Sequence, residues 1–106
     1  MPKFLIQGRY GVDGVKGLLK EGGSGRRAAV EKAAQSVGGK LETIYYAFGD
    51  TDVFVILDLP DNASATALAL TVGATGAISI TTTVLMTPED VDAAVKKHPS
   101  YRPPGQ

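Results

Sequence analysis

The stretch Lys40–Leu59, KLETIYYAFGDTDVFVILDL, decides the fold. β-Branched and aromatic residues lie on both sides of Gly49–Asp52, and such residues are typical of strands because they pack well on a pleated, half-buried surface. Glycine and aspartate tolerate the backbone angles of tight turns. The stretch therefore predicts two antiparallel strands joined by a short loop.

Side chains alternate along a strand, so the two faces of this hairpin can be separated. A loop centred on Asp50 and Thr51 places one apolar face against helices, with the pairs Phe48–Val53, Tyr46–Val55 and Ile44–Leu57. The opposite face is mixed and carries Leu41, Thr43, Tyr45, Ala47, Phe54, Ile56 and Asp58. An antiparallel sheet usually turns a polar second face to water. The mixed face therefore indicates a partner subunit or a ligand.

The other elements follow from periodicity and from helix-start and turn signals. Asp13 and Ser24 are the expected N-caps of two helices that the EGGSG segment separates. In chain order we expect a strand at Lys3–Tyr10, helices at 13–20 and 26–37, the hairpin, a helix from Asn62 to about Gly73 or Gly76, a strand at Ala77–Met86, a helix at 88–97, and an extended proline-rich tail at 98–106.

This order is a ferredoxin-like βαββαβ arrangement of the α+β class, with a split first helix and an extra C-terminal helix. At 106 residues the chain is expected to be a single domain, residues 1–106. The first strand then lies between the third and fourth, and the helices cover one sheet face only. A second copy is the simplest cover for the other face, as a homodimer or a higher oligomer. Residues 62–88 contain no charge, which indicates burial partly by another subunit.

Composition limits the chemistry that we expect. There is no cysteine and only one histidine, His98, so neither a disulfide nor a thiolate or multi-histidine metal site is expected, and no cofactor is indicated. The formal net charge is zero, which gives no basic field for nucleic acid. The uncharged segment is too rich in Ser and Thr for a membrane span. Met1-Pro2-Lys3 leads directly into a strand pattern, so we expect a cytoplasmic protein.

The segments MPKFLIQGRY, GVKGLLKEGGSGRRAAVEKAAQSVGGKLE, YYAFGDTDVFVILDLPDNASA and SYRPPGQ resemble the GYD domain family of small bacterial proteins. The family is named for a Gly-Tyr-Asp motif, and this chain has Gly49 and Asp52 but Thr51 at the expected tyrosine. The family resembles the dimeric α+β barrels, in which two sheets pack face to face around a cavity. The resemblance implies a fold and a dimer, and no assigned reaction.

Two local motifs have a plainer explanation. The segment Gly23–Ala28 matches the dinucleotide fingerprint G-x-G-x-x-A, but that fingerprint requires a preceding strand, and here a helix precedes it. Arg26 and Arg27 at a helix start can hold an anion, although a solvated helix start is the favoured interpretation. Asp50 and Asp52 are too few oxygen ligands for calcium. We expect Asp52 to bond backbone N–H groups near the turn.

The mixed sheet face is the candidate ligand site. Here Gln7 and Arg9 are expected near Tyr45 and Phe54 on one side, and near Ser79, Thr81 or Thr83 on the other. A few polar groups on apolar walls are typical of a small-molecule pocket, and the alternative is a plain subunit interface. His98 completes the candidate residues, either as a general base or as a cation at a helix C-terminus.

Three functions are compatible with the sequence. The first is a homodimer that binds a small molecule between its sheets. The second is a cofactor-independent oxygenase or isomerase, which rests on analogy of fold alone. The third is a structural or regulatory interaction protein. Because no nucleophile–base pair or metal set is readable, the sequence favours binding over catalysis.

Overall fold

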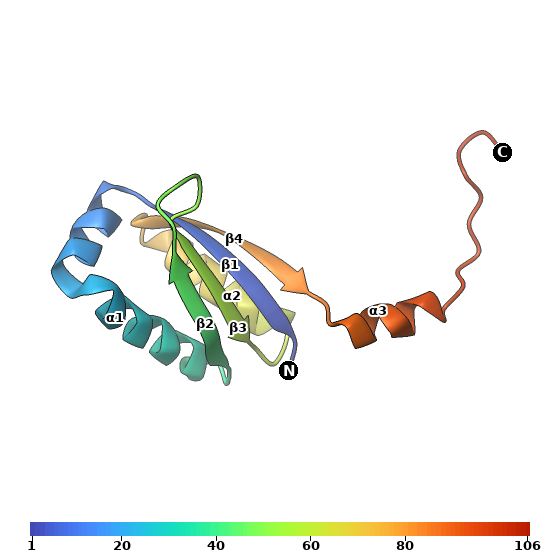
Figure 1. Ribbon diagram of the computed structural model, residues 1–106, viewed down its shortest axis with the longest axis horizontal. Helices are drawn as coiled ribbons and strands as arrows, with labels where there is room; N and C mark the ends of the chain where they lie inside the picture. The colour runs from blue at the N-terminus through green and yellow to red at the C-terminus, as the bar shows by residue number, and fades with distance from the viewer.

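The computed structural model describes residues 1–106 and has an α+β architecture (Figure 1). Its elements are β1 (Lys3–Tyr10), α1 (Val12–Ser36), β2 (Lys40–Tyr46), β3 (Val53–Asp58), α2 (Asn62–Ala74), β4 (Ile78–Leu85) and α3 (Pro88–Val95). The strands form one antiparallel sheet in the order β2-β3-β1-β4. The predicted ferredoxin-like fold, with β1 between β3 and β4, is confirmed.

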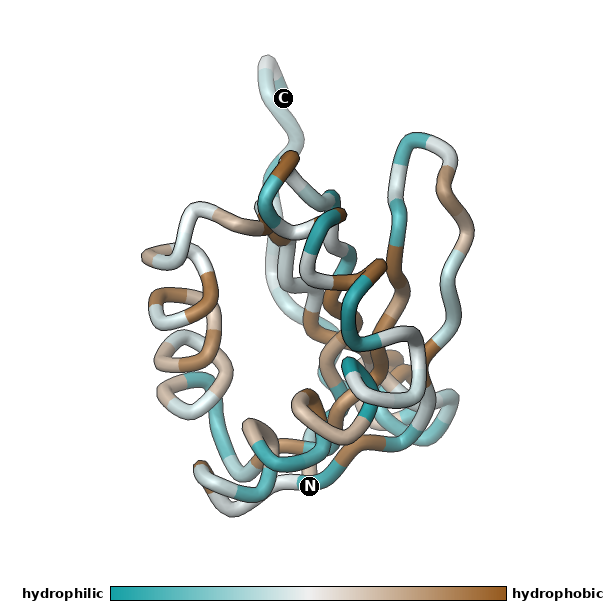
Figure 2. Tube along the Cα trace, turned by 90° about the vertical axis from the view of Figure 1, so that its left-hand side faces the viewer, coloured by the Kyte–Doolittle hydropathy of each residue, from teal (hydrophilic) through white to brown (hydrophobic).

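The core lies between the sheet and two helices. α1 packs on β2 and β1, and α2 packs on β4. The buried apolar residues are Phe4, Ala34, Val53, Val55, Leu57, Leu59 and Ala65. Figure 2 shows the hydrophobic segments gathered in the body of the molecule, while the pale, polar C-terminal tail stands clear of it. Neither α1 nor α2 covers the other face of the sheet.

α1 corrects the predicted boundaries of the split helix. The expected break over 21–25 is a kink at one residue, Gly22, whose backbone (φ 74°, ψ 170°) is far from helical. A positive φ of this kind is accessible to glycine without steric penalty, so a single glycine is enough to bend the helix. Ser24 lies inside the helix rather than at its N-cap. The N-cap at the start of α1 is Gly11, and Asp13 makes no capping hydrogen bond.

The hairpin register also differs from the prediction. Tyr46 pairs with Val53 and Ile44 with Val55, two residues away from the expected register. A shift by two keeps each strand face unchanged, so Tyr46 and Ile44 still pack against the core. Phe48 does not, because it lies in the loop with a φ of 56°, is exposed, and stacks on Tyr46 at a centroid distance of 5.9 Å.

A register irregularity between Leu41 and Thr43 moves one more residue to the other face. Leu41 pairs with Leu57 and packs against the core, so its predicted place on the mixed face is wrong. An extra residue in one strand inverts the alternation from that point onward. Ala47 lies beyond the end of β2 and therefore also leaves the mixed face.

The two shorter helices begin with clear side-chain caps. Asp61 caps α2 by accepting a hydrogen bond from the Ser64 N–H at 2.8 Å. α3 begins with a capping box and a proline in its first turn, and no residue of α3 is buried. Figure 1 shows α3 and the tail beyond it extending away from the body. The radius of gyration, 16.9 Å, accordingly exceeds the value of about 13 Å for a compact domain of this length.

Candidate functional site

The uncovered face of the sheet, which we call the open face, is organised in rows that cross all four strands. One row runs Tyr45, Phe54, Gln7, Thr81 from β2 to β4, because each residue pairs directly with the next. The adjoining row runs Thr43, Ile56, Leu5, Thr83. Directly paired residues of antiparallel strands share a face and lie within side-chain contact. Five of the candidate residues, namely Gln7, Tyr45, Phe54, Thr81 and Thr83, thus lie together on this face.

The centre of the open face is apolar and is flanked by hydrogen-bonding groups. Tyr45 is 69% exposed, and Phe54 is also exposed, whereas Leu5 and Ile56 are half-buried. Gln7 is held by its Oε1 atom, which accepts a hydrogen bond from the Thr51 hydroxyl at 3.3 Å. An apolar floor with a few oriented polar groups is the usual composition of a small-molecule site.

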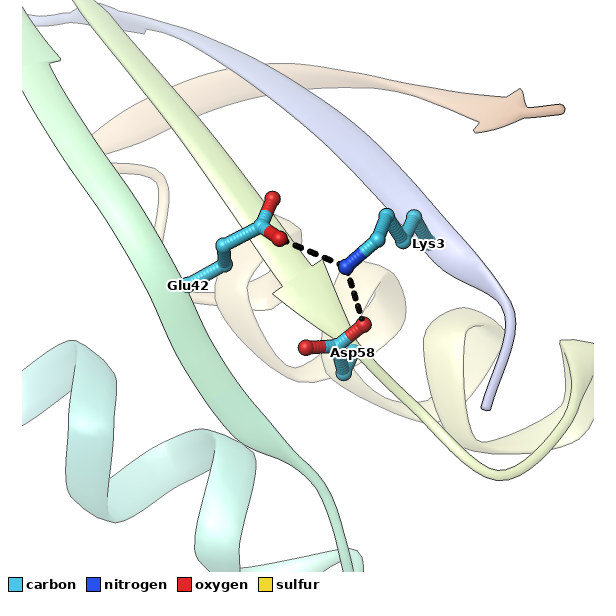
Figure 3. Close-up of polar contacts among 3 residues, drawn as sticks. All are labelled: Lys3, Glu42 and Asp58. Atoms are coloured by element: carbon cyan, nitrogen blue, oxygen red, sulfur yellow. Dashed lines mark hydrogen bonds and ion pairs between the residues drawn. The ribbon is translucent and has the colours of Figure 1, made fainter. Parts of the chain in front are cut away.

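An ionic cluster closes one end of the open face. Lys3 Nζ donates to Glu42 and to Asp58 Oδ1, the latter at 2.9 Å (Figure 3). The hydrogen bond to Glu42, followed by that to Asp58, raises the pKa of Lys3, so the ammonium form is favoured. Glu42 reaches Lys3 from the irregular part of β2. The cluster makes this end polar and so confines the apolar part of the face to the central rows.

Arg9 and the hairpin loop lie toward the other end. Arg9 is exposed and pairs with Ser79 of β4, so it is displaced by one row from Tyr45 and Phe54. Asp52 does bond a backbone N–H group, as expected, but that group belongs to Tyr10 of β1 at 2.8 Å and not to the turn. Asp52 therefore ties the loop to the end of the central strand.

His98 is not brought to the open face by this chain. It follows α3, is exposed, and has a φ of 47°. Figure 1 shows α3 and the segment that follows it leading away from the body, and His98 belongs to that segment, whereas the six other candidate residues belong to the strands of the sheet. Tyr101 and Arg102 of the tail are exposed as well.

A second hollow lies on the helix side of the sheet, where the sequence predicted only core. This cleft between α1 and α2 has a deep part of about 100 Å³ with an almost wholly apolar lining, and an outer part of about 280 Å³. Both parts are bordered by Tyr10, Arg26, Val72 and Ile78. Sequence patterns identify which residues face inward, but they do not specify how far apart two helices lie on a sheet.

The mouth of this cleft carries polar groups close together. Arg26 Nη1 pairs with Glu21 Oε2 at 3.2 Å, and both residues line the outer part. Outside the lining, the Tyr46 hydroxyl donates to the Gly23 carbonyl oxygen at 3.4 Å. Burial, followed by the proximity of Tyr10, raises the pKa of Tyr46, so its phenol stays protonated and remains a hydrogen-bond donor. The cleft thus combines an apolar interior with the Arg26–Glu21 ion pair at its entrance.

Comparison with known proteins gives one match. The model of the GYD domain matches residues 4–95. The chain belongs to the GYD domain family. The match extends from β1 to the last residue of α3, so the projecting helix is part of the GYD domain. Neither the curated proteins nor the solved structures include a significant match.

Two further observations bear on the chemistry of this GYD domain. No group of three or more His, Cys, Asp or Glu side chains is placed to hold a metal ion. None of its helices has the length and apolar character that crossing a membrane requires.

Proposed function

We propose that this GYD domain protein is a homodimer in which the open faces of two sheets meet and enclose a small molecule. The observation that carries the proposal is the row Tyr45, Phe54, Gln7, Thr81, which combines large apolar side chains with oriented polar groups on a face that no helix covers.

The energetics favour a cover for this face. Tyr45 and Phe54 are adjacent and both exposed, and Leu5 and Ile56 extend the apolar area beside them. Burying apolar surface is favourable by roughly 25 cal/mol per Å². An antiparallel sheet with helices on one side commonly turns a polar face to water, and here the polar groups are mainly at the ends and along β4. A second copy offers the same apolar centre and so provides a matching surface.

A second candidate site is the helix-side cleft, and a specific observation favours it. The Arg26–Glu21 pair is exposed, and exposed ion pairs contribute only about 0–1 kcal/mol. An anionic or hydrogen-bonding group of a ligand can therefore replace Glu21 at Arg26 while its apolar part enters the deep part of the cleft. In this alternative the protein still binds a small molecule, but within one subunit.

One titration separates the two sites. The probe is the fluorescent apolar anion 8-anilinonaphthalene-1-sulfonate, with dimer mass followed by sedimentation equilibrium. Thr83→Trp fills the open face, and Gly17→Leu fills the cleft, because Gly17 borders the cleft and a Cβ atom there meets no atom within 4 Å. Gly73→Leu is the matched control, since Gly73 is also helical, meets nothing within 4 Å and lies outside the cleft lining.

The outcomes are distinct. Loss of binding in Thr83→Trp alone supports the site between the sheets, whereas loss in Gly17→Leu alone moves the ligand to the cleft. If the wild type does not bind the probe, or if neither variant changes binding, both sites are refuted. If the wild type is a monomer at micromolar concentrations, the dimer is refuted.

The catalytic alternative, a cofactor-independent oxygenase or isomerase, has less support. His98 is the only histidine of the chain, and it belongs to the exposed segment beyond α3, which leads away from the open face and from the cleft. We therefore prefer binding to catalysis. A purely structural or regulatory role predicts a dimer whose interface is dry and takes up no probe.

A cytoplasmic location remains part of the proposal and is tested by fractionation of cells that express the tagged chain.

A further inference from the structure

α3 is a short helix that lacks cover in its own chain. It has eight residues, and its start is well defined, because Thr87 Oγ1 accepts from the Asp90 N–H and Asp90 Oδ2 accepts from the Thr87 N–H, both at 3.0 Å. A helix of this length is marginal in water, and most helical stability in proteins comes from packing of an apolar face. No residue of α3 is buried.

The apolar face of α3 is narrow and continuous. Val91, Ala94 and Val95 recur at the i, i+3, i+4 spacing that places them on one side of a helix. Val91 is 49% exposed and Val95 is 67% exposed. Glu89, Asp92 and Lys96 lie on the opposite side, so α3 is amphipathic, with its polar side suited to water.

The body of the protein has an uncovered groove of matching character between α2 and β4. Its volume is about 420 Å³, and its lining contains no charged residue: Phe4, Asn62, Ala65, Thr66, Ala69, Leu70, Thr82 and Val84. Leu70 is 69% exposed and Val84 is 52% exposed. The absence of charge extends over the whole of residues 62–88. The groove therefore suits an apolar helix face and offers nothing to a charged one.

The chain path keeps α3 out of its own groove. Val84 borders the groove, β4 ends at Leu85, and only Met86 and Thr87 precede α3. Thr87 must keep its extended backbone (φ −77°, ψ 161°) to cap the helix, which leaves Met86 alone to reverse the chain. α3 instead continues outward from the end of β4 (Figure 1).

We propose that α3 of one copy docks, through Val91 and Val95, into the α2–β4 groove of a second copy, and that the exchange is reciprocal. Reciprocal exchange about a two-fold axis closes the assembly, so both helices and both grooves are covered. This inference rests on the proposed homodimer for its second copy, but it does not depend on a ligand.

Disulfide trapping tests the contact directly, because the chain has no cysteine of its own. A tagged chain with Val91→Cys is mixed with an untagged chain with Leu70→Cys, and the two are unfolded together, refolded and oxidised. The same mixture is made with Val95→Cys. Each chain has one cysteine, so a tagged–untagged disulfide reports contact between copies. Leu19→Cys is the matched control, since Leu19 is an exposed leucine on α1 that does not line the groove.

We expect the Leu70 pairings to give the mixed disulfide in at least tenfold greater yield than the Leu19 pairings. Equal yields would overturn the docking. A chain that carries both Leu70→Cys and Val91→Cys, and closes an intrachain disulfide at high dilution, would also overturn it, because α3 would then reach its own groove.

A second measurement does not depend on trapping. The double variant Val91→Glu/Val95→Glu changes only exposed residues and so leaves the body folded, which circular dichroism verifies. We expect it to raise the dimer Kd by at least tenfold in sedimentation equilibrium, and an unchanged Kd would contradict the inference. A wild type that is monomeric refutes the homodimer itself, whereas a dimer with no mixed disulfide refutes only the exchange of α3.

Discussion

Replacing Tyr45 by alanine should weaken the dimer while leaving the folded subunit intact. Tyr45 is 69% exposed in one chain, and a buried tyrosine covers about 200 Å². About 140 Å² therefore remains to be covered by the second copy, which corresponds to at most about 3.5 kcal/mol at roughly 25 cal/mol per Å². Both copies lose the ring, so the dimer loses about 4–7 kcal/mol, or about 10³–10⁵-fold in Kd.

Sedimentation equilibrium over a range of concentrations measures this change. Leu19→Ala is the matched control, because Leu19 is 82% exposed on α1 and lies away from the open face. Urea unfolding of Tyr45→Ala, extrapolated to the monomer, should give the wild-type free energy within about 0.5 kcal/mol, as is usual for an exposed position.

Equal dimer Kd values for Tyr45→Ala and the wild type would refute the reasoning, since the ring would then be exposed in the assembly too. A comparable loss in Leu19→Ala would show that the subunits meet through α1 instead.

Three further predictions concern one subunit. Phe4→Ala removes a ring that is 1% exposed and should lower the free energy of unfolding by about 3–5 kcal/mol in urea titrations; a loss below about 1 kcal/mol would contradict the core described above. The Ser64 N–H bond lowers the pKa of Asp61 below 3.8, so the stability that this carboxylate contributes is present above pH 4 and lost as the pH falls through the folded-state pKa. Thermal melts of the wild type and Asp61→Ala should thus differ at pH 6 and converge in acid, and a constant difference would exclude this cause. Burial raises the pKa of Tyr46, so the stability that its neutral phenol contributes is present below about pH 10 and is lost as the pH rises through the folded-state pKa. Tyr46→Phe should therefore be less sensitive than the wild type to alkaline unfolding, and equal sensitivity would contradict the burial of the phenol.

The sequence predicted the sheet because its strongest signals are local. The alternation in Lys3–Tyr10 and in Val53–Asp58 identified the strands and their inward faces, and the order of elements then limited the topology. The register of the hairpin was two residues wrong, because the loop is longer than a tight turn and places Phe48 at a positive φ. The irregularity at Leu41 leaves no local signature, so its change of face could not be foreseen.

The site was predictable where it follows from strand pairing and not where it follows from packing. Gln7, Phe54, Tyr45 and Thr81 share one face because side chains alternate along the strands of a sheet with β1 at its centre. Their alignment in one row depends on the hairpin register, which was predicted two residues wrong. The helix-side cleft depends on the separation of α1 and α2, and the direction of α3 depends on a single hinge residue. The cleft and the direction of α3 depend on tertiary packing, which the hydrophobic periodicity of a single sequence does not predict.

Hydroxyl-radical footprinting of the unmodified protein tests most directly whether the open face is covered by a second copy. The oxidation rates of Tyr45 and Leu19, each divided by its rate in the urea-unfolded chain, are compared above and below the dimer Kd. We predict that Tyr45 is protected at high concentration and becomes reactive on dilution, while Leu19 is reactive throughout. Equal and constant reactivity of Tyr45 and Leu19 at all concentrations would contradict the account.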